Sequence, residues 1–420
     1  MTPVTQAPAP PLDEAERARG RWLAIASNVP SMTFWTAFTG QLPTLALVSL
    51  GASETLIGVQ SGLQLGFQSL QLPALRLVSW FPKRRILIAG QAIAQVSSLP
   101  LVFFAAIAAL DPGTAQALVF GALVGTAIGL DLSNLVWYPL LRAYVEPERI
   151  GRFFGVVRTS WHAALIVFFA GGQLWLARHD DGFGLLFGVA WALGALRIAL
   201  IARLPERSER TGERIRAREA LALLGSDGKL RRYLTGVCWS YGVRFAAFPF
   251  AVVMLRRALG FSNADVVAAT IAQFVGGLVS LYPWGALVDR LGSYVVFRFA
   301  ALGQAALLVA LAQLESPGAL THGVVIALFF LQSVLAAGYG VADTRLLFEL
   351  APPEAPARLL VIVSVTAGLV CGLAPVLAGA VLDPLLARAA APLPVYHGFF
   401  AVAAALQAVS FLPLRRFRRA

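Results

Sequence analysis

The residues best suited to chemistry are a few ionisable side chains inside long apolar stretches of the sequence. Asp131, Arg158 and His162 lie in two successive stretches, and Arg244 lies in a later one. Because a charge at the centre of a bilayer costs about 2.5–3.5 kcal/mol on insertion scales, each of these groups requires a partner or a function. A carboxylate and an imidazole held out of water can both titrate near neutral pH. Asp131, His162 and Arg158 are therefore candidate proton-coupling residues, and a static Asp131–Arg158 ion pair is the structural alternative.

Several polar side chains in other apolar stretches could contact a solute. Arg244 would attract an anionic group of a substrate or pair with Asp131. Four glutamines share one helical face at a spacing of four, four and three residues, namely Gln60, Gln64, Gln68 and Gln71. Lipid would penalise such a stripe, so it should line a cavity or pack against another helix. The remaining candidate substrate contacts are Asn134 and Tyr138, on the face of Asp131, together with Trp35, Gln273 and Tyr241.

The elements that position these residues must be membrane helices. The 420 residues are 58% hydrophobic and 13% charged, with a mean hydropathy of +0.72, whereas soluble domains carry about 25% charged residues. The net charge of +12 falls in short clusters between apolar runs, which argues against a nucleic-acid partner. No catalytic motif, phosphate-binding loop or metal-ligand spacing is present, and Cys238 and Cys371 lie in apolar runs. We therefore expect neither an enzyme nor a bound metal or cofactor.

Turn residues and charges divide the chain into twelve predicted spanning helices of an all-α membrane protein. A bilayer requires about 20 apolar residues for each span. The predicted helices are 22–49, 55–80, 86–110, 115–142, 153–177, 183–204, 232–256, 263–287, 294–314, 322–346, 358–383 and 394–414. They form two six-helix bundles, 22–204 and 232–414, with an N-terminal tail at 1–21, a central loop at 205–231 and a basic tail at 415–420.

The positions of Lys and Arg predict the orientation of these helices. With both termini in the cytoplasm, 25 basic residues flank the helices on the cytoplasmic side and four on the other side. This excess is typical of a multi-pass protein of a bacterial-type inner membrane. No apolar stretch precedes residue 22, so we expect the first helix to act as its own uncleaved insertion signal.

A short internal repeat predicts that the two bundles are pseudo-symmetric. The pattern Leu-Leu…Pro-Glu…Arg begins at Leu140 and ends at Arg152, and it recurs from Leu346 to Arg358 at a constant offset of 206 residues. Both copies follow the fourth predicted helix of a bundle. Parallel repeats of this kind place a substrate site between the halves, near the middle of the membrane.

The loop after the eighth predicted helix resembles the signature of a known family. It reads Gly-Ala-Leu-Val-Asp-Arg-Leu-Gly from Gly285 to Gly292 and is similar to the G-x-L-x-D-R-x-G motif of the major facilitator superfamily. The resemblance, with the twelve helices and the repeat, implies the fold of that family over residues 20–415. It also implies that Gly285, Asp289, Arg290 and Gly292 form a gating loop.

Together these features predict a secondary active transporter that moves a small solute by alternating access, coupled to protons. Its expected partners are a small-molecule substrate, protons and the lipid bilayer, and each chain should work as a monomer. A lipid-moving protein or a membrane-complex assembly factor on the same scaffold is the alternative. A lipid mover should have an apolar cavity that opens sideways, and the glutamine stripe and Arg244 argue against such a cavity.

Overall fold

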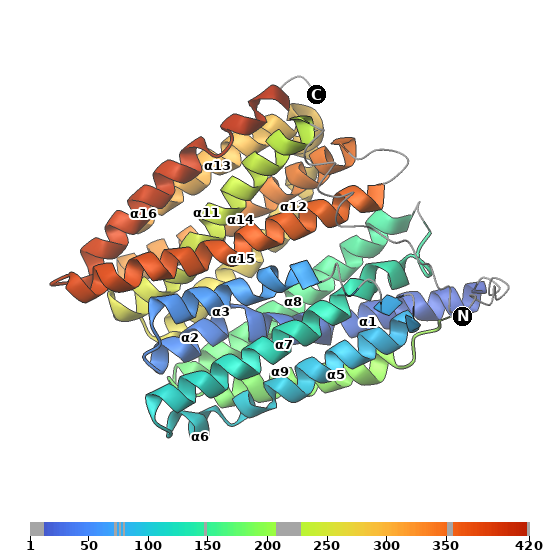
Figure 1. The fold of residues 1–420 in the computed structure, drawn as a ribbon, viewed down its shortest axis with the longest axis horizontal. Coiled ribbons are helices and arrows are strands. Elements are labelled where there is room, and N and C mark those ends of the chain that lie inside the picture. Colours follow the sequence, from blue (N-terminus) through green and yellow to red (C-terminus); the bar gives the residue numbers. More distant parts are fainter. Residues whose placement is uncertain are drawn as a thin grey trace.

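The computed structural model describes residues 12–70, 74, 77–78, 80–146, 149–206, 228–350 and 356–417, and these residues contain helices and no strands (Figure 1). The all-α prediction is therefore confirmed. The predicted central loop falls mostly on residues 207–227, which lie outside the described residues, as do Gln71 and parts of both repeat segments, 147–148 and 351–355.

The N-terminal half contains the helices that precede the central loop. They are α1 (Glu14–Thr39), α2 (Gln41–Ser49), α3 (Glu54–Gly66) with η1 (Phe67–Leu70), α5 (Lys83–Val102), α6 (Phe104–Ala108), α7 (Pro112–Leu141), α8 (Ile150–Leu176) and α9 (Phe183–Ile201). Asp111 caps α7 by accepting the Thr114 N–H at 2.8 Å, and this bond lowers the pKa of the exposed Asp111 carboxyl.

The C-terminal half contains the remaining helices. They are α11 (Gly228–Arg257), α12 (Asn263–Leu291), α13 (Ser293–Leu311), α14 (Ala319–Leu350), α15 (Pro356–Arg388), α16 (Pro392–Val409) and η3 (Leu412–Phe417). Within this half α11 packs on α15 and α16, and α14 packs on α12 and α13.

In the described chain, ten helices are long and apolar enough to cross a bilayer. The first predicted span is divided into α1 and α2 at Gly40. Pro43 explains this break, because its ring excludes a regular hydrogen bond to the carbonyl of Thr39, four residues earlier. The second predicted span corresponds to α3 and the segment that follows it. The twelve-span prediction is consistent with these elements.

The first helix starts earlier than the apolar pattern predicts. It begins at Glu14 rather than at residue 22, so residues 14–21 are helical instead of belonging to a tail. The cause is a capping box in which Asp13 accepts the Glu16 N–H at 2.7 Å and Glu16 accepts the Asp13 N–H at 3.0 Å. Polar residues can therefore extend a membrane helix when a cap satisfies its first turn.

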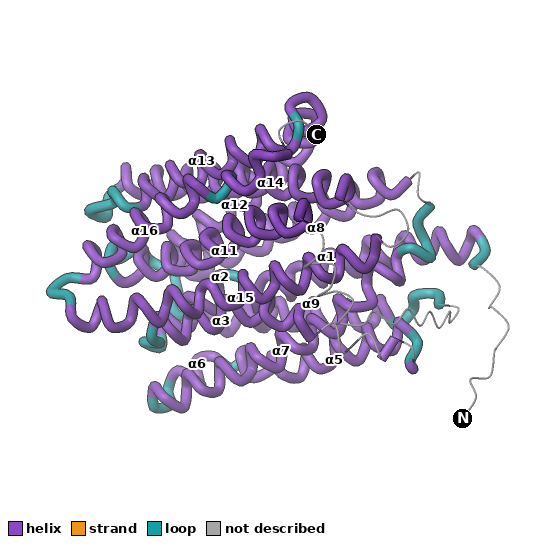
Figure 2. The backbone as a smooth tube through the Cα atoms, turned by 45° about the horizontal axis from the view of Figure 1, so that its top comes forward, coloured by secondary structure: helices purple, strands orange, loops and turns teal. Residues whose placement is uncertain are grey.

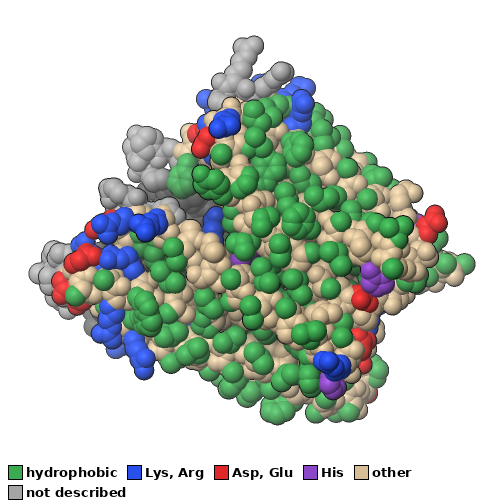
Figure 3. Space-filling view, turned by 180° about the vertical axis from the view of Figure 1, so that it is seen from behind, with side chains coloured by type: hydrophobic (Ala, Val, Ile, Leu, Met, Phe, Trp, Pro, Cys, Tyr) green, Lys and Arg blue, Asp and Glu red, His purple; other side chains and the backbone are tan. Residues whose placement is uncertain are grey.

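The outer surface of the bundle is apolar along most of its length (Figure 3). Exposed side chains there include Val96 and Val167, each 72% exposed, and Leu377, 65% exposed. The basic groups in that view gather mainly at the end of the bundle where the chain begins (Figure 3). We call this end, which carries Arg142, Arg152 and Arg415, the basic end, and we call the opposite end the far end. A belt of exposed hydrocarbon between polar ends is the surface that lipid requires.

The two halves meet mainly along two pairs of helices, and α11 also contacts α2 and α3. The helix α3 packs on α15, and α8 packs on α12. Figures 1 and 2 both place α15 beside α3, and Figure 1 shows the helices of the two halves diverging toward the basic end. The contact between the halves is therefore concentrated toward the far end.

Glycines allow α3 and α15 to touch through their backbones. A Cβ added at Gly372 would lie 2.7 Å from the Cα of Gly66, and one added at Gly368 would lie 2.7 Å from the carbonyl oxygen of Leu65. One added at Gly62 would overlap the carbonyl oxygen of Gly372. Small residues of this kind bring membrane helices close enough for van der Waals contact along their length. The spacing of the glycines in α15 indicates this packing role from sequence.

We expect Gly62→Ala to lower the melting temperature of the purified protein, because the added methyl group forces the two halves apart. Overpacking of this kind costs about 1–3 kcal/mol. The matched control is Gly121→Ala in α7, where nothing lies within 4 Å of the added methyl group. Alanine is the better helix former by about 1 kcal/mol, so the control should be neutral or stabilising. Equal melting temperatures for the two variants would contradict the proposed contact.

Candidate functional site

A buried carboxylate joins the halves at the far end. Glu54, the first residue of α3, has a side chain only 8% exposed and accepts from Arg257 at 2.7 Å and from the Tyr396 hydroxyl at 2.8 Å. Arg257 also donates to the carbonyl of Ala52. Burial of a carboxylate requires such partners, and both donors belong to the opposite half. Loss of this contact would leave a buried charge without compensation.

A second carboxylate caps α3 from the opposite half. Asp383 of α15 accepts the N–H groups of Glu54 at 2.8 Å and Thr55 at 3.0 Å. The first turn of a helix has N–H groups with no partner inside the helix, and a carboxylate there also meets the positive end of the helix dipole. The start of α3 is thus satisfied by the C-terminal half.

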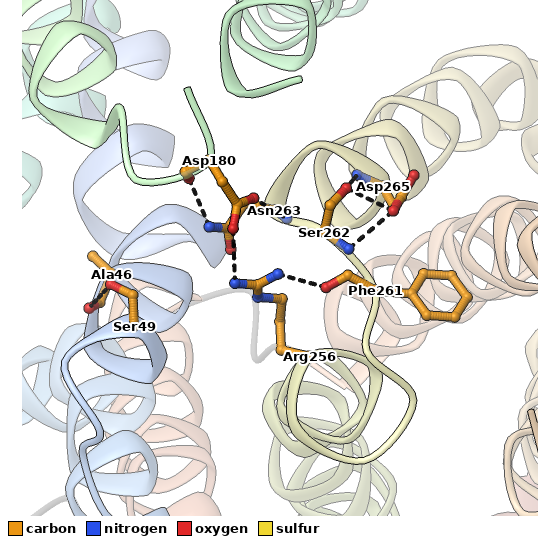
Figure 4. A network of polar contacts seen from close by, with 8 residues as sticks. All are labelled: Ala46, Ser49, Asp180, Arg256, Phe261, Ser262, Asn263 and Asp265. Atoms are coloured by element: carbon orange, nitrogen blue, oxygen red, sulfur yellow. Dashed lines mark hydrogen bonds and ion pairs between the residues drawn. The ribbon is translucent and has the colours of Figure 1, made fainter. Parts of the chain in front are cut away.

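The start of α12 has the mirror arrangement (Figure 4). Asp180, which follows α8, accepts the N–H of Asn263 at 2.9 Å and the Arg256 guanidinium at 3.2 Å, while its carbonyl accepts from the Asn263 side chain at 2.7 Å. Ser262 and Asp265 complete a capping box on the same helix. Each half therefore supplies an aspartate that caps a helix of the other half, and both contacts lie at the far end.

A polar and aromatic layer lies deeper along the contact between the two halves, which we call the seam. Gln41 of α2 donates to Gln273 of α12 at 3.1 Å and accepts from Thr270. Phe169 of α8 stacks on Phe274 of α12 with ring centroids 5.3 Å apart. The predicted contact Gln273 therefore lies between the halves, where its amide holds the far end closed.

The glutamine stripe of α3 is largely hydrogen-bonded within the bundle. Gln60 accepts from Thr44 of α2 at 3.0 Å, and Gln64 donates to Asp131 of α7 at 3.2 Å. Gln68 packs against Gly368 of α15. The stripe thus faces other helices rather than lipid, as the sequence predicts, and its packing role is the one visible in these contacts.

The predicted proton-coupling residues are divided between two helices. Asp131 is buried, 3% exposed, and lies ten residues before the end of α7, which is about 15 Å of helix. His162 of α8 is 7% exposed, bonds the Arg158 carbonyl through Nδ1 at 2.8 Å and stacks on Trp161. The Arg158 side chain is exposed. Both the coupling role and the alternative Asp131–Arg158 ion pair remain predictions.

Two further candidates accompany Asp131 on α7 toward the basic end. Tyr138 is 58% exposed and lies near Phe154, with ring centroids 6.2 Å apart, and Asn134 is half-buried. Trp35 is a different case, because it is partly buried and packs against the main apolar core. The roles of Asn134 and Tyr138 as substrate contacts therefore remain predictions.

Arg244 of α11 sits among aromatic rings of the C-terminal half. Its guanidinium carbon lies 4.7 Å from the ring centre of Tyr241 and 5.2 Å from that of Phe245. The Tyr241 hydroxyl donates to Asp343 at 2.9 Å, and Tyr233 donates to the other oxygen of Asp343 at 2.6 Å. Asp343 thus meets two hydroxyls rather than an arginine, and Arg244 forms no ion pair within the described chain.

Beside Arg244 lies a pocket enclosed by α11, α13, α14 and α16. Its polar lining comprises Arg244, Gln304, Gln332 and Gln407. Gln407 donates to Gln304 at 2.8 Å and to Ser240 at 2.9 Å, while the side-chain nitrogen of Gln304 and the side-chain oxygens of Gln332 and Gln407 have no partner among the described atoms. The other lining residues are apolar, namely Ala247, Phe248, Leu307, Leu308, Leu311, Leu328 and Phe329. This chemistry suits a small anionic or amphipathic group.

The predicted gating loop forms the last turns of α12 and its C-cap at the basic end. Gly292 ends this helix with a φ of 79°, a conformation that favours glycine, and its N–H bonds the Val288 carbonyl at 2.9 Å. Asp289 pairs with Arg345 of α14 at 3.4 Å, and Arg345 also donates to the Val288 carbonyl at 2.6 Å. Gly285 is half-buried and Arg290 is exposed. These contacts lie within the C-terminal half rather than across the seam.

Sequence reasoning missed a buried arginine in the N-terminal half. Arg197 of α9 is 5% exposed, donates to Gln91 of α5 at 2.7 Å and lies over the Trp137 ring at 5.7 Å. The signal was available, because Arg197 interrupts a long apolar run. Asp180 and Asp383 gave no comparable signal, since each stands near the end of a helix, where charged residues are ordinary.

Comparisons with known proteins agree with this architecture. Residues 233–420 match the sequence model of the Major Facilitator Superfamily. Nothing among the curated proteins matches the chain. A crystal structure of the nucleoside transporter NupG aligns with a TM-score of 0.68 at 14% identity, over 96% of this chain and 99% of that chain. A crystal structure of a NupG mutant aligns with a TM-score of 0.71 at 12% identity, over 94% of this chain and 99% of that chain.

A third solved structure has similar coverage. A POT family transporter in complex with a thioalcohol conjugated peptide aligns with a TM-score of 0.70 at 12% identity, over 95% of this chain and 96% of that chain. At such identities the likeness establishes the fold.

We expect the double variant Asp180→Ala with Asp383→Ala to populate a state in which the far end is open. Loss of a helix cap costs about 0.5–2 kcal/mol, and here both caps stabilise only the closed far end. Spin labels at Ser49→Cys and Ser316→Cys, in a background lacking Cys238 and Cys371, would report the distance between the halves by pulsed electron spin resonance.

The control for this experiment is Asp111→Ala, which removes a cap of the same kind from α7 within a single half. It should lower stability without changing the distance distribution. If the double variant leaves that distribution unchanged as well, the two aspartates do not hold the far end closed.

Proposed function

We propose that this chain is a member of the major facilitator superfamily and a secondary transporter that moves a small solute by opening its two halves alternately to either side of the membrane. The family is one of transporters, not of enzymes. The observation that carries the proposal is the paired capping of α3 by Asp383 and of α12 by Asp180. These contacts join the halves at one end only, and water can replace them when that end opens.

The proposed orientation places the basic end in the cytoplasm and the far end outside, with both chain termini cytoplasmic. The distribution of Lys and Arg supports this orientation and a bacterial-type inner membrane. The described conformation is then one in which the external side is closed. A solute would reach the seam from the cytoplasmic side, where the helices diverge (Figure 1).

The proposed solute site lies on the cytoplasmic side of the Gln41–Gln273 layer. Gln64, Asp131, Asn134 and Tyr138 offer hydrogen-bond donors and acceptors there, at the depth where parallel repeats place a substrate. A solute with several hydrogen-bonding groups on a partly apolar body matches these side chains. Among the solved structures that share the fold, NupG is named a nucleoside transporter, and the POT family transporter was solved with a thioalcohol conjugated peptide, which are solutes of this general kind.

We propose that Asp131 carries the coupled proton, with His162 and Arg158 modulating it from α8. Asp131 has a buried carboxylate near the middle of the membrane, and the Gln64 amide donates to it at 3.2 Å. Both forms of a carboxyl can be accommodated by an amide, which donates to a carboxylate and accepts from a carboxylic acid.

Arg244 is proposed as the group that attracts an anionic part of the solute. Arginine remains protonated at all relevant pH values, and its planar donors suit a carboxylate or a phosphate. In the adjoining pocket the side-chain nitrogen of Gln304 is a donor without a partner among the described atoms, so it could donate to the same group. An anionic substituent would therefore be bound by the C-terminal half while the proton is carried by the N-terminal half.

We expect Asp131→Asn to abolish accumulation driven by a pH gradient while leaving exchange of solute across proteoliposome membranes. The amide keeps the hydrogen-bonding geometry but cannot release a proton. The solute would be chosen first by a thermal-shift screen over metabolites, drugs and lipids. The matched control is Asp343→Asn, which alters a carboxylate held by two tyrosines in the other half.

Two results would count against the proposal. If Asp131→Asn retains full accumulation driven by the pH gradient, Asp131 is not the proton carrier. If only lipids raise the melting temperature in the screen, the lipid-moving alternative replaces solute transport.

A further inference from the structure

A second pocket lies at the basic end of the C-terminal half, on the outside of the bundle and away from the seam. It is formed by the start of α11, the end of α16 and the short helix η3, and its volume is about 420 Å³. The lining residues are Arg232, Trp239, Val409, Leu412, Pro413, Arg415 and Arg416.

The pocket concentrates positive charge without a counter-charge. Its lining has three arginines and no carboxylate. In the part of the chain that the structure describes, Arg232, Arg415 and Arg416 form no ion pair or hydrogen bond with another side chain. Three guanidinium groups around one hollow repel one another, and a bound anion would relieve that repulsion.

The rest of the lining is apolar and exposed. Trp239 is 38% exposed, Val409 39% and Leu412 46%. Trp239 lies seven residues farther along α11 than Arg232, which places it about 10 Å deeper in the membrane. Tryptophan at this level is typical of the boundary between headgroups and acyl chains. The pocket therefore has a cationic side toward the water and an apolar side toward the hydrocarbon.

We propose that this pocket binds an anionic phospholipid of the cytoplasmic leaflet. The phosphate lies among Arg232, Arg415 and Arg416, and an acyl chain follows Trp239 and Val409 into the bilayer. Basic pockets on the cytoplasmic face of membrane bundles attract anionic headgroups in this manner. A free phosphate would use only the arginines, whereas a phospholipid also covers the exposed apolar side chains.

The proposed site does not depend on which solute is transported. All of its elements belong to the C-terminal half, so a bound lipid would anchor α11, α16 and η3 to one leaflet. It depends only on the basic end facing an anionic leaflet.

The test compares lipids that differ only in headgroup charge. The full chain, purified in a mild detergent, is titrated with phosphatidylglycerol, with phosphatidylcholine of the same acyl chains, and with sodium phosphate. Native mass spectrometry counts the lipids retained, and the melting temperature reports their effect on stability. We expect one tightly retained phosphatidylglycerol and a rise in melting temperature, with weaker retention of phosphatidylcholine and no effect of phosphate.

Two sets of variants assign the binding to the pocket. Arg415→Gln with Arg416→Gln should weaken phosphatidylglycerol binding by about tenfold or more, because two charge-assisted contacts are lost. The matched control, Arg142→Gln with Arg152→Gln, removes two exposed arginines from the same end of the other half and should leave binding unchanged. Trp239→Ala keeps all three arginines and should weaken phosphatidylglycerol while leaving any phosphate binding as it was.

Three outcomes would overturn the proposal. Equal retention of the two phospholipids excludes selection of an anionic headgroup. An equal loss in both double variants reduces the effect to the overall charge of the basic end. A rise in melting temperature with phosphate alone, unaffected by Trp239→Ala, identifies a site for a soluble anion instead of a lipid.

Discussion

A helix that begins inside a membrane protein needs acceptors for the N–H groups of its first turn, and α3 and α12 obtain some of theirs from the opposite half. Asp383 accepts from the first turn of α3, and Asp180 accepts from that of α12. The stability of each helix end is therefore tied to the position of the other half. Separation at the far end must expose both helix starts to water, so the local chemistry of capping and the equilibrium between conformations are governed by the same contacts.

The glycine seam determines how closely those polar groups can approach. Because α3 and α15 touch through backbone atoms at Gly62 and Gly372, the start of α3 lies within reach of Asp383, and Arg257 and Tyr396 can enclose Glu54. Backbone contact at glycines brings the two helices close together, but it does little to select one particular arrangement of the halves. The hydrogen-bonded carboxylates at the far end supply the specificity, since each accepts donors from the other half in a defined geometry.

Most of the fold could be predicted from local sequence patterns. Apolar length predicted the spanning helices, and the loop from Gly285 to Gly292 indicated a resemblance to the family whose sequence model matches residues 233–420. The early start of α1 was missed because it depends on the capping box of Asp13 and Glu16 rather than on apolar length. By contrast, the contact between Asp383 and Glu54 joins residues 329 positions apart, and no periodicity links them. Which partner a single charged residue meets depends on how the helices cross. The packing of the whole bundle decides this, and no local sequence motif does.

The buried Arg197 and the half-buried Arg244 differ in the same respect, because the partners of each depend on how the helices pack. Arg197 donates to Gln91 and is enclosed by its own bundle. The Arg244 guanidinium instead rests on the face of Tyr241, whose hydroxyl donates to Asp343, so one aromatic side chain stands between the cation and the carboxylate. Their charges partly compensate through space, yet the described chain holds no ion pair that an incoming anion would have to break. A guanidinium placed in this way can engage an anionic group without first losing a partner, which lowers the desolvation penalty of binding relative to a preformed salt bridge.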